Sequence, residues 1–221
     1  MNHTKYIKYL GLVILFSLNL EAISLDEALE DDLRSSLNQE RDIYRHPFET
    51  LSFFGVTSDM TVVELSPGSG WYTEILASYL ESEGKLIAAA YDSSKGSYQK
   101  RSRERYENKL SSDVKYNKVK IVNLGEILAP NGSVDAVLTF RNLHNWLGPY
   151  MDTLFVQSFN ALRSGGIFGI VEHRADPGTS LEGMKKSGYV TEELAIEKAE
   201  DVGFVLVKTS EISANSKDTK N

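Results

Sequence analysis

The sequence predicts an α/β domain in which helices cover both faces of a doubly wound, mostly parallel sheet. Short apolar runs typical of strands alternate with segments of helical periodicity over residues 61–208. The runs are almost continuously apolar, as in Lys85–Tyr91, which is typical of strands buried on both faces of a parallel sheet. With 221 residues and 41% hydrophobic content, the chain is long enough for one such domain and short for two.

The first 24 residues have the pattern of a secretory signal peptide. Two lysines precede an apolar run over residues 10–20, and the small residues Ala22 and Ser24 follow at a spacing suited to signal peptidase. The run is short for a membrane span, and an uncleaved N-terminal anchor is the alternative. We therefore expect an exported, periplasmic or secreted protein whose mature chain, residues 25–221, forms a single domain without stable membrane insertion.

Composition excludes several classes of function. The formal net charge is −7, whereas general nucleic-acid binding requires a basic surface. The basic run within residues 95–120 is therefore expected to be a solvated helix face. The chain has no cysteine, which excludes disulfides, thiolate chemistry and a lipid-modified cysteine at the cleavage site.

The mature chain is expected to begin with a helical segment over residues 25–55. Leu25–Leu37 is acidic and amphipathic, with apolar residues at helical spacing. In the second part, Pro47 is suited to open a helix directly after His46, and Gly55 is suited to end it. The residues expected to face inward from this second helix are Phe48, Leu51 and Phe54.

The later elements follow from the same patterns. Strands are expected at 61–65, 85–91, 119–122, 134–140, 167–172 and 204–208. Helices are expected at 71–82, 97–110, 150–162 and 191–202, with a turn at 163–166 and a mobile flap at 176–188.

One stretch, Thr61–Thr73, has the features of a nucleotide-type ligand site. Its strand ends at Ser66 and Pro67, and Gly68 and Gly70 allow a tight turn and close approach of a ligand to the backbone. The helix that follows directs its N-terminal amides into the same turn. Glu64, at the end of the strand, offers a carboxylate to ligand hydroxyls.

The other polar clusters of the chain also follow predicted strands. In a doubly wound sheet, ligands bind outside the carboxyl ends of the strands, where the strand order reverses. We therefore expect one site that gathers the residues Tyr91, Asp92, Asn123, Leu124, Arg141–Trp146 and Glu172–Arg174 beside the glycine turn. A nicotinamide site would add a third glycine after Gly70, and Trp71–Thr73 supplies none.

These features resemble the class I S-adenosylmethionine-dependent methyltransferases, over Thr61 to about Lys208. Glu64–Gly70 matches the family's first motif, Gly132–Leu138 its fourth strand with its lead-in, and Leu162–Gly166 the turn before its fifth strand. More narrowly, Arg41–Gly55, Arg141–Trp146 and Ser213–Thr219 resemble a group of exported bacterial predicted methyltransferases. The resemblance implies a Rossmann-like sheet and S-adenosylmethionine as the cofactor.

The resemblance also implies the cofactor-binding residues, which are Glu64, Ser66, Gly68, Gly70, Tyr72, Asp92, Asn123 and Leu124. Asn123 stands where the family often has an acid that contacts the adenine amino group. The usual position of the ribose-binding acid falls near Ala90, whereas this chain has its carboxylate at Asp92. Strand side chains repeat every second residue, so Asp92 is expected to point to the same side as Ala90.

For the acceptor side, His144 is the candidate general base, with Arg141, Asn142 and His46 as further catalytic candidates. His173 is a second choice as base. Possible clamps for an anionic substrate are Arg45, Arg141 and Arg174. For any one histidine, the competing interpretation is a partly buried residue with a structural role. A metal site built from His46, His144, His173 and Glu172 has no ligand spacing to support it, and no metal is expected.

The expected function is transfer of a methyl group to an unidentified, small-molecule acceptor. The alternative is a non-catalytic, methyltransferase-like ligand-binding or interaction protein of the periplasm, because S-adenosylmethionine is made in the cytoplasm. One departure concerns the end of the sheet. The family finishes with an antiparallel strand, and only polar residues follow Lys208, so either the chain is truncated or the sheet lacks that edge strand.

Overall fold

A computed structural model describes residues 22–219, and the predicted signal peptide lies almost entirely outside this range. Five parallel strands form one sheet in the order β3-β2-β1-β4-β5. The strands are β1 (Thr61–Leu65), β2 (Lys85–Ala90), β3 (Lys120–Asn123), β4 (Val134–Phe140) and β5 (Leu162–Val171). The order reverses between β1 and β4, so the prediction of a doubly wound parallel sheet is confirmed.

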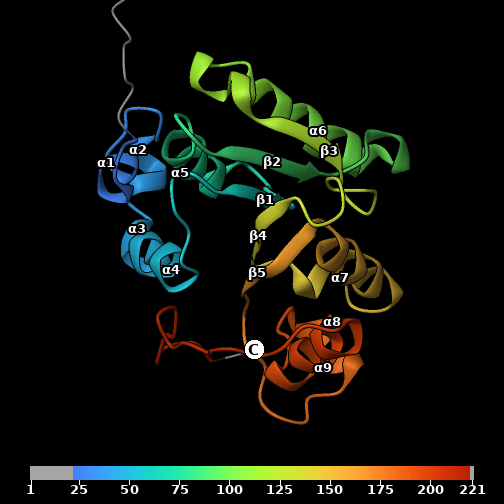
Figure 1. Cartoon of the computed structure of the whole chain (residues 1–221). Helices are drawn as coiled ribbons and strands as arrows, with labels where there is room; N and C mark the ends of the chain where they lie inside the picture. Colours follow the sequence, from blue (N-terminus) through green and yellow to red (C-terminus); the bar gives the residue numbers. More distant parts are fainter. Residues whose placement is uncertain (1–21, 220–221) are drawn as a thin grey trace, which may run out of the picture.

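Helices cover both faces of the sheet (Figure 1). One face packs against α5 (Trp71–Tyr79), α6 (Ser97–Leu110) and the short helix η2 (Val114–Lys118), and the other against α7 (Pro149–Ala161) and α9 (Glu192–Val202). Each face has its own apolar cluster, because successive strand residues point to opposite sides. Val62 and Ala88 belong to one cluster, and Val63 and Ala89 to the other.

Four short helices precede the sheet, namely α1 (Leu25–Leu29), α2 (Ser36–Gln39), α3 (Asp42–Arg45) and α4 (Pro47–Phe53). The predicted helix over Leu25–Leu37 is therefore wrong beyond Leu29. The helix that opens at Pro47 and ends before Gly55 is confirmed, and Leu51 and Phe54 face inward as expected. Phe48, in contrast, remains exposed.

The second half of the chain departs from prediction at two places. The predicted turn at 163–166 lies inside β5, where pairing with β4 passes from Val134–Leu162 directly to Ala136–Ile167 and the residues between bulge out of the ladder. The predicted flap contains a helix, α8 (Leu181–Ser187), whose first turn is capped by the Ser180 hydroxyl and whose end is set by Gly188.

The predicted strand at 204–208 is wrong. Phe204 packs against Phe168 of β5, with ring centroids 5.0 Å apart, but the backbone then leaves the sheet and Val205 and Val207 are each 82% exposed. The remaining described residues form a loop below α4 without regular structure (Figure 1). Within residues 22–219, β5 is therefore an edge strand, and no antiparallel strand follows it. No helix in this range is long and apolar enough to span a membrane.

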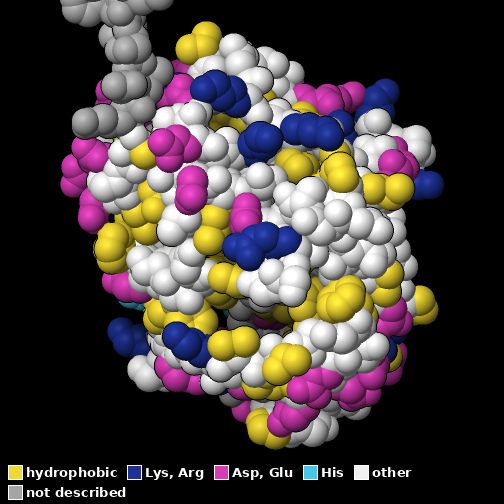
Figure 2. All heavy atoms as spheres, viewed as in Figure 1, with side chains coloured by type: hydrophobic (Ala, Val, Ile, Leu, Met, Phe, Trp, Pro, Cys, Tyr) yellow, Lys and Arg dark blue, Asp and Glu magenta, His cyan; other side chains and the backbone are white. Residues whose placement is uncertain are grey.

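Two short helices lie beside the strand ends where the site was expected. These are η1 (Ser93–Lys95) after β2 and η3 (Leu143–Asn145) after β4. On the face shown in Figure 2, acidic side chains gather over α9.

Candidate active site

The ends of β1 and β4 meet at the point where the strand order reverses. Among the described residues, the non-glycine residues with positive φ are His46 at 45°, Ser66 at 51° and Arg141 at 61°. Ser66 directly follows β1 and Arg141 directly follows β4. This left-handed conformation is uncommon for side chains other than asparagine and aspartate, and it concentrates at ligand sites.

The glycine turn forms one wall of a cavity between the ends of β1 and β2. Gly68 has φ of 61°, and an added Cβ there would meet no atom within 4 Å, so the backbone lies open to a ligand. The cavity is small, with a volume of about 10 Å³. It is lined by Ser66, Pro67, Gly68, Ala90, Tyr91, Ser102, Arg103 and Tyr106. The buried Ser66 hydroxyl makes no hydrogen bond of normal geometry within residues 22–219, although it lies close enough to the Tyr91 hydroxyl to interact with it.

Glu64 does not line this cavity but lies behind it. Its carboxylate accepts a hydrogen bond of 2.6 Å from the Thr73 hydroxyl, which is 3.1 Å from the Tyr106 hydroxyl. Complete burial raises the pKa of Glu64 to about 7, and the bond from Thr73 offsets this only in part. The Thr73 and Tyr106 side chains therefore separate a ligand in the cavity from Glu64. The ligand contacts the carboxylate directly only if these side chains move.

Part of the basic helix α6 covers the glycine turn instead of facing solvent. An added Cβ at Gly70 would lie 2.8 Å from Cδ of Lys109, whose ammonium pairs with the buried Glu74. Arg103 donates hydrogen bonds to the Tyr91 carbonyl at 3.2 Å and to Oδ1 of Asn123 at 3.1 Å. The interpretation of a uniformly solvated face is therefore wrong for Arg103 and Lys109.

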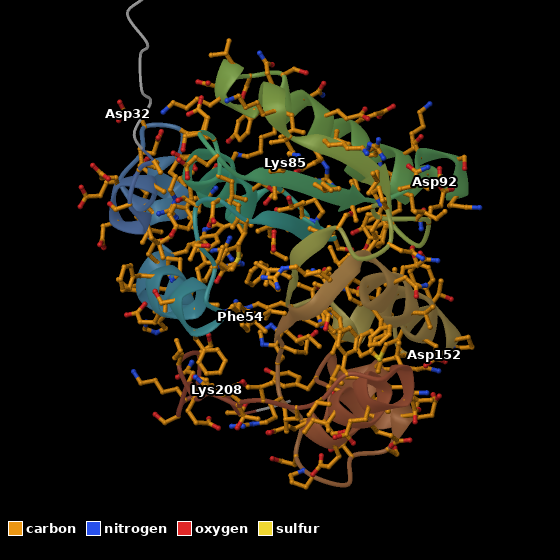
Figure 3. All side chains as sticks on the ribbon, viewed as in Figure 1. Asp32, Phe54, Lys85, Asp92, Asp152 and Lys208 are labelled. Carbon is orange, nitrogen blue, oxygen red and sulfur yellow. The ribbon has the colours of Figure 1, made fainter. Side chains whose placement is uncertain are left out.

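Two cofactor candidates at the ends of β2 and β3 are engaged within the protein. Asp92 caps η1 through hydrogen bonds from the Ser94 amide and hydroxyl, which lower the pKa of its partly buried carboxyl. Figure 3 shows Asp92 beyond the end of β2. Leu124 is buried, and its amide donates to the Ala90 carbonyl at 2.8 Å.

Asn142 and Tyr72 connect the two halves of the site. The Asn142 amide donates to the Ser66 carbonyl at 3.2 Å and to the Phe140 carbonyl at 3.1 Å, so it ties the end of β4 to the glycine turn. Tyr72 stacks on Phe140 with ring centroids 3.5 Å apart and is only 4% exposed. In this structure both residues stabilise the site and leave little surface for a ligand.

His144 lies at the other end of the site, in η3, and is oriented by Glu172. Nδ1 of His144 is 3.1 Å from Oε1 of Glu172, which also accepts a hydrogen bond of 2.7 Å from the His173 amide. The bond from Glu172 raises the pKa of His144 above 6.5 despite partial burial. This arrangement leaves Nε2 free to exchange a proton with a substrate.

The His144 side chain is partly exposed at the surface, beside the end of α8. Its side chain is 23% exposed, and Gly188, at the end of α8, lies against the ring, where an added Cβ would be 4.0 Å from Cδ2. Figure 2 shows the surface hollowed below the end of β5, between α4 and α8. The ring of His173 is 6.2 Å from that of His144, and burial lowers the pKa of His173.

The structure brings together His144, Arg141 and Asn142 at the end of β4, whereas no described contact joins His46 to His144. Within residues 22–219, no group of three or more potential ligands is arranged to hold a metal ion. Sequence reasoning missed the roles of Glu172 as partner of His144 and of Arg103 as a wall of the cavity. The role of Glu172 could have been found from the sequence, because this residue ends a predicted strand. The role of Arg103 could not, because the sequence does not show which face of α6 packs over the turn.

No family model matches the sequence, and a comparison with curated proteins also finds no match. Solved structures do match. A SAM-dependent methyltransferase from Aquifex aeolicus superimposes with a TM-score of 0.61 at 17% identity, over 84% of this chain and 91% of that protein. Geranyl diphosphate methyltransferase in complex with SAM superimposes with a TM-score of 0.55 at 14% identity, over 80% of this chain and 73% of that protein. The [4+2]-cyclase SpnF superimposes with a TM-score of 0.61 at 16% identity, over 81% of this chain and 63% of that protein. The chain therefore has the fold of the SAM-dependent methyltransferases, the fold that its strand order and glycine turn predict.

Proposed function

We propose that this protein is an S-adenosylmethionine-dependent methyltransferase that acts on a small-molecule acceptor. The observation that carries the proposal is the glycine turn. It joins β1 to the N-terminus of α5 at the reversal of strand order, with an open Gly68 and the buried Ser66 hydroxyl beside it. When bound there, the cofactor would supply a methyl group already activated on a sulfonium.

The residues of the cradle fit such a ligand. The backbone at Gly68 and the first amides of α5 would hold the amino-acid part, and Ser66 would supply a further hydrogen bond. Tyr91 and Asn123 lie where the nucleoside part would extend, and the Arg103 side chain now occupies that space through its bonds to both residues. A cavity of about 10 Å³ has room for little more than one water molecule, so Arg103 has to move for the whole cofactor to enter.

On the acceptor side, His144 would receive the proton that the nucleophile loses on methylation. Glu172 holds the imidazole through Nδ1, which directs Nε2 to the substrate and stabilises the charged ring. Positioning of the acceptor would supply much of the remaining acceleration, because a sulfonium methyl needs alignment more than activation.

A second candidate function is a ligand-binding or interaction protein without methyl transfer. The contacts that Arg103 makes with Tyr91 and Asn123 favour it, because they close the nucleoside end of the cavity. SpnF, named as a [4+2]-cyclase, also has this fold, which illustrates that the fold alone does not fix the reaction.

Calorimetry with S-adenosylmethionine and with its demethylated product tests the proposal. Gly68→Asn should weaken binding at least tenfold, because the new side chain enters the cavity. Gly132→Asn is a matched control, since Gly132 has φ of 67°, also has no atom within 4 Å of an added Cβ, and lies before the opposite end of β4. Absence of binding of either compound to the wild-type chain would refute the cofactor assignment.

The expected export of the protein is a separate part of this proposal. Cleavage before Leu25 would remove Ser24, whose hydroxyl accepts from the Glu27 amide and caps α1. Loss of this cap costs about 1 kcal/mol of helix stability, which the packing of Leu25 and Ala28 has to offset. Mass spectrometry of the mature chain from a periplasmic fraction would locate the cleavage site, and an intact N-terminus in membranes would favour the anchor.

A further inference from the structure

The Arg103 side chain closes one end of the cavity beside the glycine turn. It lines the cavity and is only 16% exposed. Its terminal nitrogen Nη1 donates to the Tyr91 carbonyl at 3.2 Å and to Oδ1 of Asn123 at 3.1 Å. Tyr91 directly follows β2 and Asn123 is the last residue of β3. A single guanidinium therefore bridges the ends of two neighbouring strands.

The guanidinium is also held by its own helix. Nε of Arg103 donates to Oε1 of Glu107, one turn further along α6, at 2.7 Å. The Glu107 side chain is 48% exposed, so this contact lies at the solvent edge of the helix. An outward rotation of Arg103 would break its bonds to Tyr91 and Asn123 and leave the Glu107 carboxylate within reach. The two bonds that break have uncharged acceptors, and such bonds contribute only modestly to the closed arrangement.

The end of the cavity that Arg103 closes presents hydrogen-bond acceptors. Nδ2 of Asn123 donates to Oε2 of Glu126 at 3.3 Å, which turns Oδ1 toward Arg103. The second acceptor is the Tyr91 carbonyl. The hydroxyl and amino groups of a nucleoside are donors, as are the N–H groups of a guanidinium. Arg103 therefore occupies the acceptors that a bound nucleoside would use.

We propose that Arg103 is an internal competitor of the cofactor, which keeps the site closed until a ligand with suitably placed donors displaces it. The proposal rests on the proposed methyltransferase function for the identity of this ligand. In the closed arrangement the cavity has a volume of about 10 Å³, which admits no nucleoside. Since only the open arrangement accepts the ligand, the apparent affinity is reduced by the fraction of molecules that are open.

Calorimetry with S-adenosylhomocysteine on the full mature chain tests this competition. Arg103→Ala should bind the compound about tenfold more tightly than the wild type, as expected if roughly one molecule in ten is open. Alanine favours the helical conformation, so α6 should persist. The matched control is Arg105→Ala, which removes an exposed arginine from the same helix and should change the affinity less than twofold. A residue that only contributes contacts to the cofactor would give the opposite result, because its loss weakens binding.

Asn123→Asp tests the same contact from the other side. A carboxylate at this position would make the bond from Arg103 charge-assisted and so stabilise the closed arrangement. The variant should therefore bind S-adenosylhomocysteine roughly fivefold more weakly than the wild type. This loss should disappear when Asn123→Asp is combined with Arg103→Ala. Additive effects of the two substitutions would overturn the proposal, because residues that compete through a shared contact must be coupled.

The outcomes separate this proposal from the methyltransferase assignment, with adenosine as a second probe and cooperative thermal unfolding as the check that each variant is folded. If the wild type binds S-adenosylhomocysteine and Arg103→Ala binds it equally or more weakly, the competitor is overturned and the assignment stays intact. If neither chain binds it, but Arg103→Ala binds adenosine more tightly than the wild type, the competitor stands and the cofactor assignment is wrong. If Arg103→Ala binds neither compound, both are overturned.

Discussion

At the residue scale, two carboxylates of the site have opposite surroundings. Glu64 is fully buried with one hydroxyl partner, and its pKa rises to about 7. Glu172 has two amides and an imidazole within hydrogen-bonding reach. Burial favours the neutral form of a carboxyl group, and hydrogen bonds to its oxygens favour the ionised form. The same residue type therefore lies in an apolar surrounding at one position and among hydrogen-bond donors at the other.

Glu64 should make the ligand-free protein less stable as pH rises. Its pKa in the folded state lies above the ordinary 4.5, so the folded chain holds this proton more tightly than the unfolded chain. Its favourable contribution is present below pH 4.5 and is lost as pH rises through about 7. In urea unfolding, the free energy of unfolding should be lower at pH 8 than at pH 4.5 by on the order of 3 kcal/mol. Glu64→Gln should remove this difference. Equal pH dependence in wild type and variant would contradict this, and the exposed Glu104→Gln serves as the control.

Glu172 should set the proton affinity of His144. Glu172→Gln removes the carboxylate, so the pKa of His144 should fall to or below 6.5, as followed by its ring signals in NMR. With its raised pKa, His144 stabilises the folded state below pH 6.5, and this contribution is lost as pH rises through the folded pKa. The variant should lose this pH dependence. The exposed Glu193→Gln should leave both properties unchanged, and an unshifted His144 would show that Glu172 has no such role.

At the element scale, the N-terminal helices are fastened to the start of α5. Trp71, the first residue of α5, donates its indole N–H to the Asn38 carbonyl at 3.0 Å and lies against the guanidinium groups of Arg34 and Arg45. Asn38 also donates to Glu74, one turn further along α5, at 2.9 Å. The segment that carries Arg45 and His46 is therefore placed by contacts with the glycine-turn helix.

The Arg34–Asp42 pair should be important for this attachment. The Arg34 side chain is fully buried and Asp42 is 28% exposed, so Asp42→Asn leaves a buried cation with weaker partners. We expect the free energy of unfolding to decrease by about 2 kcal/mol, which corresponds to a decrease of roughly 4–8 °C in melting temperature. The fluorescence of Trp71 should change as well. The matched control is Glu104→Gln, which breaks an exposed pair and should cost less than about 0.5 kcal/mol. A loss no larger than that of the control would show that the pair is dispensable.

At the scale of the whole molecule, the sheet concentrates its chemistry at one edge. The glycine turn, Asn142 and the hydrogen-bonded pair His144–Glu172 all follow strand ends. The segments that carry them are up to 108 positions apart, from Glu64 to Glu172. On the far side of the sheet from β3, β5 presents an unpaired edge within the described residues, and Phe204 covers part of it through Phe168.

Ligand binding at the glycine turn should stabilise the entire domain. At 100 times its dissociation constant, a ligand that binds only the folded state adds about 2.7 kcal/mol, which corresponds to roughly 5–10 °C for a domain of this size. We expect this increase in melting temperature with S-adenosylmethionine, no increase in Gly68→Asn, and none with a nicotinamide dinucleotide. An increase with the nicotinamide compound alone would assign the cradle to a different cofactor.

The sequence by itself determined the sheet and the glycine turn. Buried parallel strands are continuous apolar runs, and Gly68 and Gly70 mark backbone conformations that other residues adopt only with strain, so both are local signals. It also indicated His144, because strand ends converge in this fold. The sequence did not reveal the bulge at 163–166, the helix inside the predicted flap, or the fate of residues 204–208. These features depend on the tertiary contacts that each segment makes.

Only the tertiary structure decided how the side chains of the site are paired. Arg103 and Lys109 belong to a charged helix whose pattern is that of a solvated face, yet the docking of α6 places them over the turn. Glu172 and His144 are 28 positions apart, and Asn142 and Ser66 are 76 apart. Hydrogen bonds act over a few ångströms, so such pairs exist only once the sheet has brought the strand ends together.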